Sequence, residues 1–233
     1  MAAGHESGDA LRRSERWLYR RLEGGDPLWA PQLAVGTAIV LNLALSEKVT
    51  IGPTWLLPAV ETVLLLVLFM TTRGIRATQH FPARRRFALM VIGLVSLTNI
   101  VSVCLLIHYL LRGGHVAGRP LIGSGALLFA TNVLLFSVWY WELDGGGPVE
   151  RFRGTATLRD FQFPQMENPQ LAPPNWRPGF GDYLYTSFTN ATAFSPTDTM
   201  PLSHPAKAVM ALQSATALAT VALVVARAVN ILA

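Results

Sequence analysis

The stretch FALMVIGLVSLTNIVSVCLLIHYLL, residues 87–111, contains no Asp, Glu, Lys or Arg in 25 consecutive positions. A helix needs roughly 20 mostly apolar residues to cross the hydrocarbon core of a bilayer. This stretch is long enough and apolar enough to do so. It predicts that the chain is a membrane protein.

The composition supports a lipid environment. Only 14% of the 233 residues are charged and 51% are hydrophobic, whereas a soluble domain carries about 25% charged residues. The charges gather in residues 1–27, 73–86 and 142–182, between long uncharged segments. The net charge of +5 comes from basic residues that flank these segments, which is the usual distribution at membrane boundaries. We therefore expect the lipid bilayer as a partner, and no nucleic acid.

Four further apolar segments are long enough to be transmembrane helices; they are residues 31–49, 55–72, 121–141 and 206–232. Together with residues 87–111, these segments predict an all-α membrane protein with five transmembrane helices. The first segment is the weakest of them because Glu47 and Lys48 close it.

The same pattern divides the chain into four parts. We expect a polar cytoplasmic N-terminus at 1–30, a four-helix transmembrane region at 31–141, a Pro/Gly-rich surface loop at 142–181, and a C-terminal unit at 182–233. The first thirty residues have no apolar core segment, so we expect no cleavable signal peptide and an insertion signal in the first transmembrane helix.

The surface loop at 142–181 is the longest hydrophilic segment of the chain. Proline removes a backbone donor and fixes φ, so the many prolines here exclude a long helix. The run Gly145-Gly146-Gly147-Pro148 predicts a turn with no helix start after it, and so no phosphate-binding loop. We expect an ordered cap against the membrane surface.

Residues 183–193 are moderately apolar but too short to cross a bilayer, and the polar turn Ser195-Pro196-Thr197-Asp198 follows them. A half-length apolar segment that ends at such a turn predicts a re-entrant helix and loop. Non-helical backbone at membrane depth is tolerated only inside protein or beside a water-filled cavity. The segment therefore indicates an internal vestibule.

The sequence YTSFTNATAFSPTDTMP, residues 185–201, resembles the pore helix, filter and post-filter turn of bacterial two-transmembrane potassium channels. Those sequences read approximately Y-F-S-F-x-T-x-T-T-x-G-Y-G-D-x-x-P. The matching positions are Tyr185, Ser187, Phe188, Thr192, Asp198 and Pro201. The resemblance implies a pore module in which residues 121–141 form the outer helix and residues 206–232 the inner helix. It also implies a homo-oligomer, with a tetramer expected, because one pore loop cannot enclose a path alone.

The filter itself departs from that family. A potassium filter needs two glycines so that backbone carbonyls can replace the water shell of the ion. Ser195, Pro196 and Thr197 stand there instead, and Ala193 replaces the filter threonine. We therefore expect no potassium-selective ladder of carbonyls. The remaining hypothesis is a wider path with weak selectivity for monovalent ions, lined by hydroxyl groups and by a ring of Asp198 carboxylates.

The C-terminal part also resembles a bacterial inner-membrane family of unknown function. That family ends in D-Y-x-Y-F-A-F-T-x-x-x-x-F-x-x-x-D-T and a helix that finishes in A-V-N. The matches are Asp182, Tyr183, Phe188, Thr189, Phe194, Asp198, Thr199, Ala228, Val229 and Asn230. The resemblance implies a multi-pass protein of the bacterial inner (plasma) membrane.

The last apolar segment has a polar line and a small-residue face. The polar line contains Gln213, Thr216 and Thr220, and an alanine face suits close packing of helices. The polar groups either line a water-filled path or bond to neighbouring backbone, and the pattern fits both. The candidate ion pathway is therefore Thr189, Asn190, Thr192, Phe194, Ser195, Pro196, Thr197, Asp198, Gln213, Thr216 and Thr220.

Other polar residues also fall inside apolar segments. We hypothesise that Glu61 belongs to a functional site, because an ionisable side chain inside a membrane segment is costly. The alternative is a structural role at the membrane interface or in a pair with Lys48. His108 is expected at the interface, with a proton-relay or metal role as the alternative. We interpret the asparagines as interhelical hydrogen bonders; they are Asn42, Asn99 and Asn132. No HExxH, GxSxG, P-loop, CxxC or paired-carboxylate motif is present, so we expect no enzyme, cofactor or metal site.

The orientation of the pore loop is predicted in two conflicting ways. Five arginines precede residue 31 and five more lie in residues 73–86. Positive residues favour the cytoplasmic side, so four crossings return the surface loop to the cytoplasm. The potassium channel resemblance implies that the pore loop enters from outside. Three functional hypotheses follow. The first is a channel-like pore protein, and the second is a non-conducting membrane scaffold or interaction protein that retains the pore-module fold. The third is a secondary transporter, although no internal inverted repeat with paired broken helices is visible.

Overall fold

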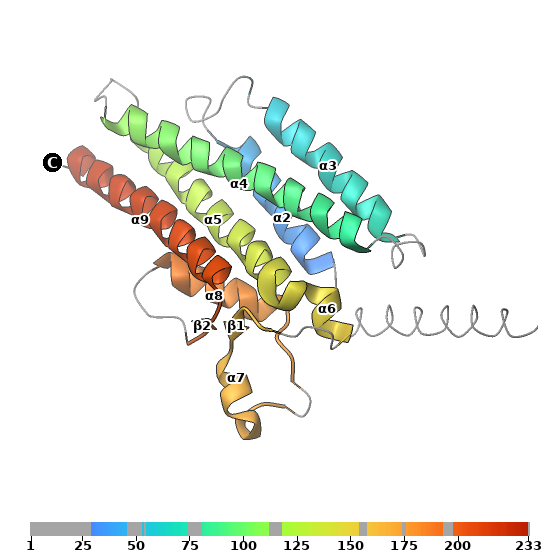
Figure 1. The fold of residues 1–233 in the computed structure, drawn as a ribbon. Helices are drawn as coiled ribbons and strands as arrows, with labels where there is room; N and C mark the ends of the chain where they lie inside the picture. The colour runs from blue at the N-terminus through green and yellow to red at the C-terminus, as the bar shows by residue number, and fades with distance from the viewer. Residues whose placement is uncertain are drawn as a thin grey trace, which may run out of the picture.

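The computed structural model describes residues 29–45, 53, 55–73, 81–111, 118–153, 158–173, 176–192 and 198–232. Of the described residues, 84% are helical, which confirms the all-α class. Figure 1 shows long helices side by side and a set of short elements at one end of them. The long helices are α2 (Trp29–Leu43), α3 (Leu56–Arg73), α4 (Phe81–Leu111), α5 (Gly118–Leu143) and α9 (His204–Leu232).

Three helices are long and apolar enough to cross a membrane. The spans are Arg85–Tyr109 in α4, Ile122–Gly146 from α5 onward, and His204–Ala226 in α9. Helices α2 and α3 contribute shorter apolar stretches, Trp29–Leu43 and Pro58–Val67. Each of the five predicted segments overlaps one long helix, and three of these helices are long and apolar enough to cross a membrane.

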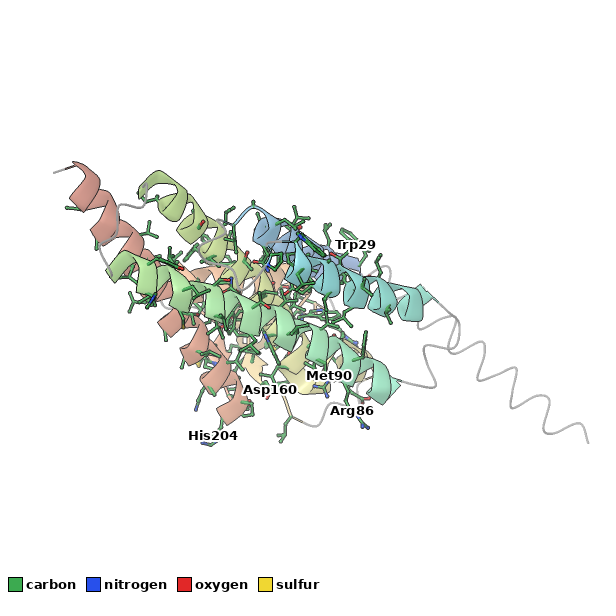
Figure 2. The ribbon with its side chains drawn as sticks, turned by 90° about the horizontal axis from the view of Figure 1, so that it is seen from above. Trp29, Arg86, Met90, Asp160 and His204 are labelled. Atoms are coloured by element: carbon green, nitrogen blue, oxygen red, sulfur yellow. The ribbon has the colours of Figure 1, made fainter. Side chains whose placement is uncertain are left out.

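Helix α5 is the centre of the bundle, because α2, α4, α8 and α9 all pack against it. One core cluster joins α2, α4 and α5 through small and β-branched side chains, among them Ala38, Val95 and Val138. Helices α3 and α9 lie at opposite sides of the bundle (Figure 1; Figure 2). The bundle therefore has two faces, one built from α2 to α4 and the other from α8 and α9, with α5 shared between them.

The surface loop forms a cap of short elements, as its prolines predict. They are η3 (Asp144–Gly146), α6 (Pro148–Arg153), β1 (Phe161–Gln162), α7 (Pro164–Glu167) and η4 (Pro169–Leu171). The three glycines that follow α5 have positive φ angles of 57°, 82° and 101°, a backbone region that other residues rarely adopt. They turn the chain sharply away from α5.

One detail of the cap corrects the sequence prediction. A helix does begin after the glycine run, since α6 starts at Pro148. Proline suits this first position because its missing N–H is one that a helix start leaves unbonded anyway. The helix has only six residues.

The half-length segment is helix α8 (Phe180–Thr192), 13 residues long. At 1.5 Å per residue it extends about 20 Å, less than the roughly 30 Å of a bilayer core. Figure 1 shows α8 beside the ends of α5 and α9, next to the cap. After it, the chain returns in β2 (Met200–Pro201), which pairs antiparallel with β1 through Phe161 and Pro201. The start of α8 therefore lies at the cap, while Ala191 near its end packs deeper in the bundle against Val133 and Ala217, and the chain is back at the cap by β2.

Candidate functional site

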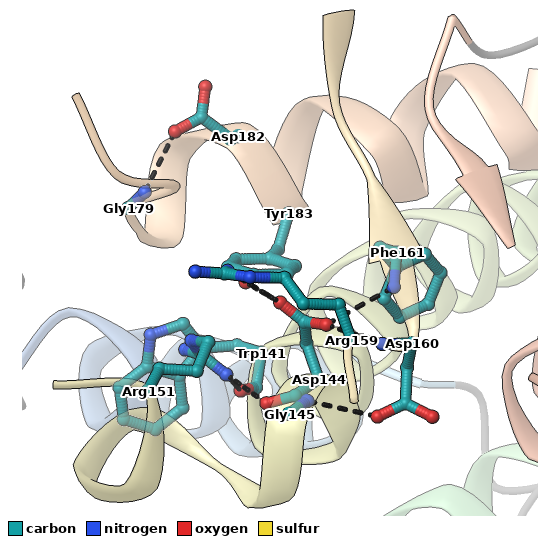
Figure 3. A network of polar contacts seen from close by, with 10 residues as sticks. All are labelled: Trp141, Asp144, Gly145, Arg151, Arg159, Asp160, Phe161, Gly179, Asp182 and Tyr183. Atoms are coloured by element: carbon teal, nitrogen blue, oxygen red, sulfur yellow. Dashed lines mark hydrogen bonds and ion pairs between the residues drawn. The ribbon is translucent and has the colours of Figure 1, made fainter. Parts of the chain in front are cut away.

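Two polar networks hold α8 in place, and the first surrounds Asp144 at the end of α5 (Figure 3). The Asp144 side chain is fully buried. Its Oδ1 accepts hydrogen bonds from the backbone N–H groups of Asp160 at 2.8 Å and Phe161 at 3.1 Å. Its Oδ2 accepts the hydroxyl of Tyr183 at 2.7 Å. One carboxylate thus joins α5, the cap strand and α8.

Two arginines supply positive charge around this carboxylate. Arg159 Nη1 lies 3.6 Å from Asp144 Oδ2. Arg151 Nη1 donates to the carbonyl oxygens of Trp141 at 2.6 Å and Asp144 at 2.7 Å. The Arg151 guanidinium also lies 5.1 Å from the centre of the Tyr183 ring, within the range of a cation–π contact. The buried acid is therefore both hydrogen-bonded and paired, as burial of a charge requires.

Tyr183 stays a neutral donor in this setting. Burial raises the pKa of its phenol well above the usual value, the positive charge of Arg151 opposes that rise, and the negative charge of Asp144 adds to it. Its ring packs edge-on against Phe163 at 5.3 Å and Phe161 at 6.4 Å. The start of α8 is consequently fixed by one hydrogen bond and two aromatic contacts.

The neighbouring carboxylate of Asp160 links the cap to α9. It accepts the backbone N–H of Gly145 at 2.9 Å and the hydroxyl of Ser203. Ser203 Oγ in turn accepts the backbone N–H of Ala206 at 3.2 Å, in the first turn of α9. This is the hydrogen bond of an N-terminal helix cap. The cap network therefore reaches one end of each of the helices α5, α8 and α9.

The second network lies between α5, α8 and α9 and centres on Gln213. Gln213 Nε2 donates to the backbone oxygen of Ser187 at 2.9 Å and to its hydroxyl at 2.7 Å. Its Oε1 accepts the hydroxyl of Tyr140 and, at 2.8 Å, the amide of Asn190. Ser187 Oγ completes the chain of bonds by donating to Val133 O at 2.7 Å. Every hydrogen-bonding side-chain atom of Gln213 is engaged inside one chain.

The rest of the predicted polar line faces the same interior. Thr216 Oγ1 accepts the amide of Asn132 at 2.7 Å, and Thr220 is buried with its hydroxyl bonded to Thr216 O at 2.7 Å. Beyond the exposed His204 and Lys207 near its start, the opposite side of α9 is exposed and apolar; it includes Ala211, Leu212, Ala215, Leu218, Ala222 and Val225. The predicted two faces of this helix are present, and the alternative of bonding to neighbouring helices describes the polar one.

The remaining predicted pathway residues divide into four groups. The hydroxyls of Thr189 and Thr192 bond to backbone oxygens within α8. Asn190 belongs to the Gln213 network. Asp198 is exposed at the start of the return to β2. The filter-like positions Phe194, Ser195, Pro196 and Thr197 lie outside the described residues.

The asparagine predictions are confirmed for two of three residues. Asn99 Nδ2 donates to Leu128 O at 3.3 Å, between α4 and α5, and Asn132 joins α5 to α9. Asn42 on α2 is buried against the carboxyl group of Glu61 on α3, and its amide atoms make no hydrogen bond of good geometry. Glu61 is fully buried inside the bundle, and Lys48, its expected alternative partner, lies outside the described residues. His108 is exposed on α4, and the described residues contain no group of three or more His, Cys, Asp or Glu side chains that could hold a metal.

Sequence reasoning missed the Asp144 network altogether. Its members lie in the cap and at the ends of two helices, with hydrogen-bond partners up to 39 positions apart. The only available signal was an acidic residue directly after an apolar span, and that signal carries no information about which distant donors meet it.

The fold defines a mostly helical membrane protein with three helices able to cross a bilayer. Comparison of the chain with protein-family models, curated proteins and solved structures finds no match.

Proposed function

We propose that the chain is a channel-like pore protein in which α5, α8 and α9 act as outer helix, pore helix and inner helix. The observation that carries the proposal is the position of α8. It is a helix too short to cross a membrane, packed against two membrane-length helices, with its end inside the bundle beside Val133 and Ala217 and the chain back at the cap in β2.

The chemistry at the end of α8 suits a cation. The C-terminal end of a helix carries a partial negative charge from its unbonded carbonyl groups. Thr192 ends α8, and the exposed carboxylate of Asp198 follows the filter-like residues. In a homotetramer, four such ends would meet at one axis. The path would then be bounded by Thr192, Asp198 and residues 193–197. Gln213 and Thr220 would not line it, because their side chains are hydrogen-bonded inside one chain.

We propose that α2 to α5 and α9 all cross the inner membrane, which gives five crossings. The start of α4 lies beside the end of α5, because Arg85 Nη2 donates to Glu142 O at 3.0 Å. The arginines of α4 and those of the cap are therefore on one face of the protein. Positive residues favour the cytoplasm, so the pore loop would enter from the cytoplasmic side, inverted relative to potassium channels.

A non-conducting membrane scaffold is the second candidate, and one observation favours it. The polar groups that α8 and α9 would need for a water-filled wall are instead bonded inside the chain, as Gln213 and Asn190 demonstrate. What α9 exposes from Ala211 to Val225 is apolar. Such a surface suits lipid or another helix at least as well as water.

Ion flux from proteoliposomes separates the two candidates. The purified chain is reconstituted with K⁺ or Na⁺ inside, and release is followed over a range of voltage and pH. We expect flux that does not discriminate between the two ions and that falls in the Asp198→Ala and Thr192→Leu variants.

Glu167→Ala is the matched control, since Glu167 is exposed on α7. Cross-linking in the same membranes should give a tetramer. A tetramer without flux under any condition would support the scaffold and overturn the channel.

A further inference from the structure

The face of the bundle away from α8 and α9 contains a buried acid. Glu61 lies in α3 with no side-chain exposure to the surroundings. The side chains of Asn42 on α2 and Thr98 on α4 lie against its carboxyl group. Three helices thus bring one acid, one amide and one hydroxyl to a single point inside the bundle.

None of these contacts has the geometry of a hydrogen bond. Both carboxyl oxygens of Glu61 and both polar atoms of Asn42 are buried without a hydrogen-bond partner. Thr98 donates its hydroxyl hydrogen to Leu94 O at 3.0 Å, so its oxygen presents lone pairs only. A buried carboxylate left in this state is costly in an apolar interior. The arrangement calls for a positively charged occupant.

We propose that Glu61, Asn42 and Thr98 form an intramembrane site for Na⁺, in which a proton on Glu61 is the competing occupant. The donors are a carboxylate oxygen, an amide carbonyl oxygen and a hydroxyl oxygen, all hard ligands suited to a hard cation. Their total charge is −1, so a monovalent ion neutralises the site, while a divalent ion would leave a net positive charge in the apolar interior.

No other described charge competes for this position. Helix α2 has no titratable side chain between Trp29 and Leu43. Helix α4 has its arginines in the first turns, at residues 84–86, and His108 near its far end. The polar side chains that contact the carboxyl group of Glu61 are those of Thr98 and Asn42, and both are uncharged. The site also stands apart from the proposed pore module, because α3 and α9 are at opposite sides of the bundle (Figure 2).

Thermal unfolding of the purified full chain in detergent tests the site directly. At pH 8, NaCl should raise the midpoint in a saturable way relative to choline chloride of equal ionic strength, because an ion that binds only the folded state stabilises it. At pH 6 more Na⁺ should be needed, because protons compete for Glu61. Ion flux is not part of this measurement, so its outcome is independent of the channel proposal.

Three variants make the test specific. Glu61→Gln should abolish the Na⁺ response, whereas Glu167→Gln, an exposed acid on α7, should retain it. Thr98→Val keeps size and shape but removes one ligand, so it should raise the half-saturating Na⁺ concentration about tenfold or more. It also provides a readout if Glu61→Gln does not fold. Equal midpoints in NaCl and choline chloride, or a Na⁺ response in Thr98→Val equal to that of the parent chain, would overturn the proposal.

Discussion

The phenolic hydroxyl of Tyr183 donates to Asp144 Oδ2 at 2.7 Å and joins the first turns of α8 to the end of α5. Both side chains are fully buried. A half-length helix cannot rely on a full membrane span for its position, so it depends on contacts of this kind. The consequences of that dependence can be measured.

Tyr183→Phe removes this hydrogen bond and keeps the aromatic packing. Hydrogen bonds to charged groups contribute about 1.5–3 kcal/mol, and we expect a loss of that size in the free energy of unfolding, measured in detergent. Tyr185→Phe is the matched control on the same helix, because Tyr185 is 60% exposed. Equal stability of the two variants would contradict the assigned role of Tyr183.

Gly147→Ala tests the turn after α5. Gly147 has φ 101° and ψ 171°, a region that is almost restricted to glycine and costs other residues about 1–3 kcal/mol. A Cβ atom there would also lie 3.2 Å from Arg85 Nε. We expect a loss of stability in that range. Gly123→Ala, in helix α5 with nothing within 4 Å of the new atom, should be neutral or stabilising.

Gly125 permits the close approach of α5 and α9. A Cβ atom at Gly125 would lie 2.2 Å from Val224 Cγ2, so one helix must shift or the valine must change rotamer. Overpacking of this kind costs about 1–3 kcal/mol. We expect Gly125→Ala to destabilise the chain and Val224→Ala in the same molecule to recover most of the loss. A double-mutant cycle measures this coupling, and strictly additive effects would argue against the contact.

The pH dependence of stability should contain a contribution from Asp182. Burial raises the pKa of its carboxyl group, while a hydrogen bond from the Gly179 backbone partly opposes the rise. The folded state therefore binds this proton more tightly than the unfolded state, whose pKa is about 3.9. Stability from this group is greatest at acid pH and falls as the pH rises from the unfolded value through the folded one.

Asp182→Asn should remove that decline. The unfolding midpoint of each variant, measured between about pH 3.5 and 7, is compared with that of the parent chain. Asp198→Asn, which changes an exposed acid, should leave the decline in place. An unchanged pH profile in Asp182→Asn would show that the raised pKa of this group is not expressed in stability.

The sequence predicted where the helices lie because each apolar stretch is continuous along the chain. Helix α8 was expected at 183–193 and is found at Phe180–Thr192, since its length and the polar turn after it are both local properties. The packing of α2, α4, α8 and α9 around α5 could not be predicted in this way. Gly125 and Val224 lie in different apolar segments, and neither one identifies the other.

The polar line of α9 illustrates the limit more sharply. Its spacing correctly placed Gln213, Thr216 and Thr220 on one face of a helix. Which neighbour that face meets depends on the position of α5 and α8, and these supply the carbonyl and amide groups that engage it. Periodicity records that residues share a face, but it contains no information about what lies opposite.

The position of Asp144 in the chain also determines when its buried contacts can form during synthesis. The ribosome produces it 16 residues before Asp160 and 39 residues before Tyr183. While α5 inserts, its terminal carboxylate can be solvated only by water or lipid headgroups. It can leave water only after the cap and α8 have been synthesised. The full set of contacts that buries Asp144 can therefore form only after Tyr183 has been synthesised, and a nascent chain stopped before Tyr183 should still carry this acid exposed at the membrane surface.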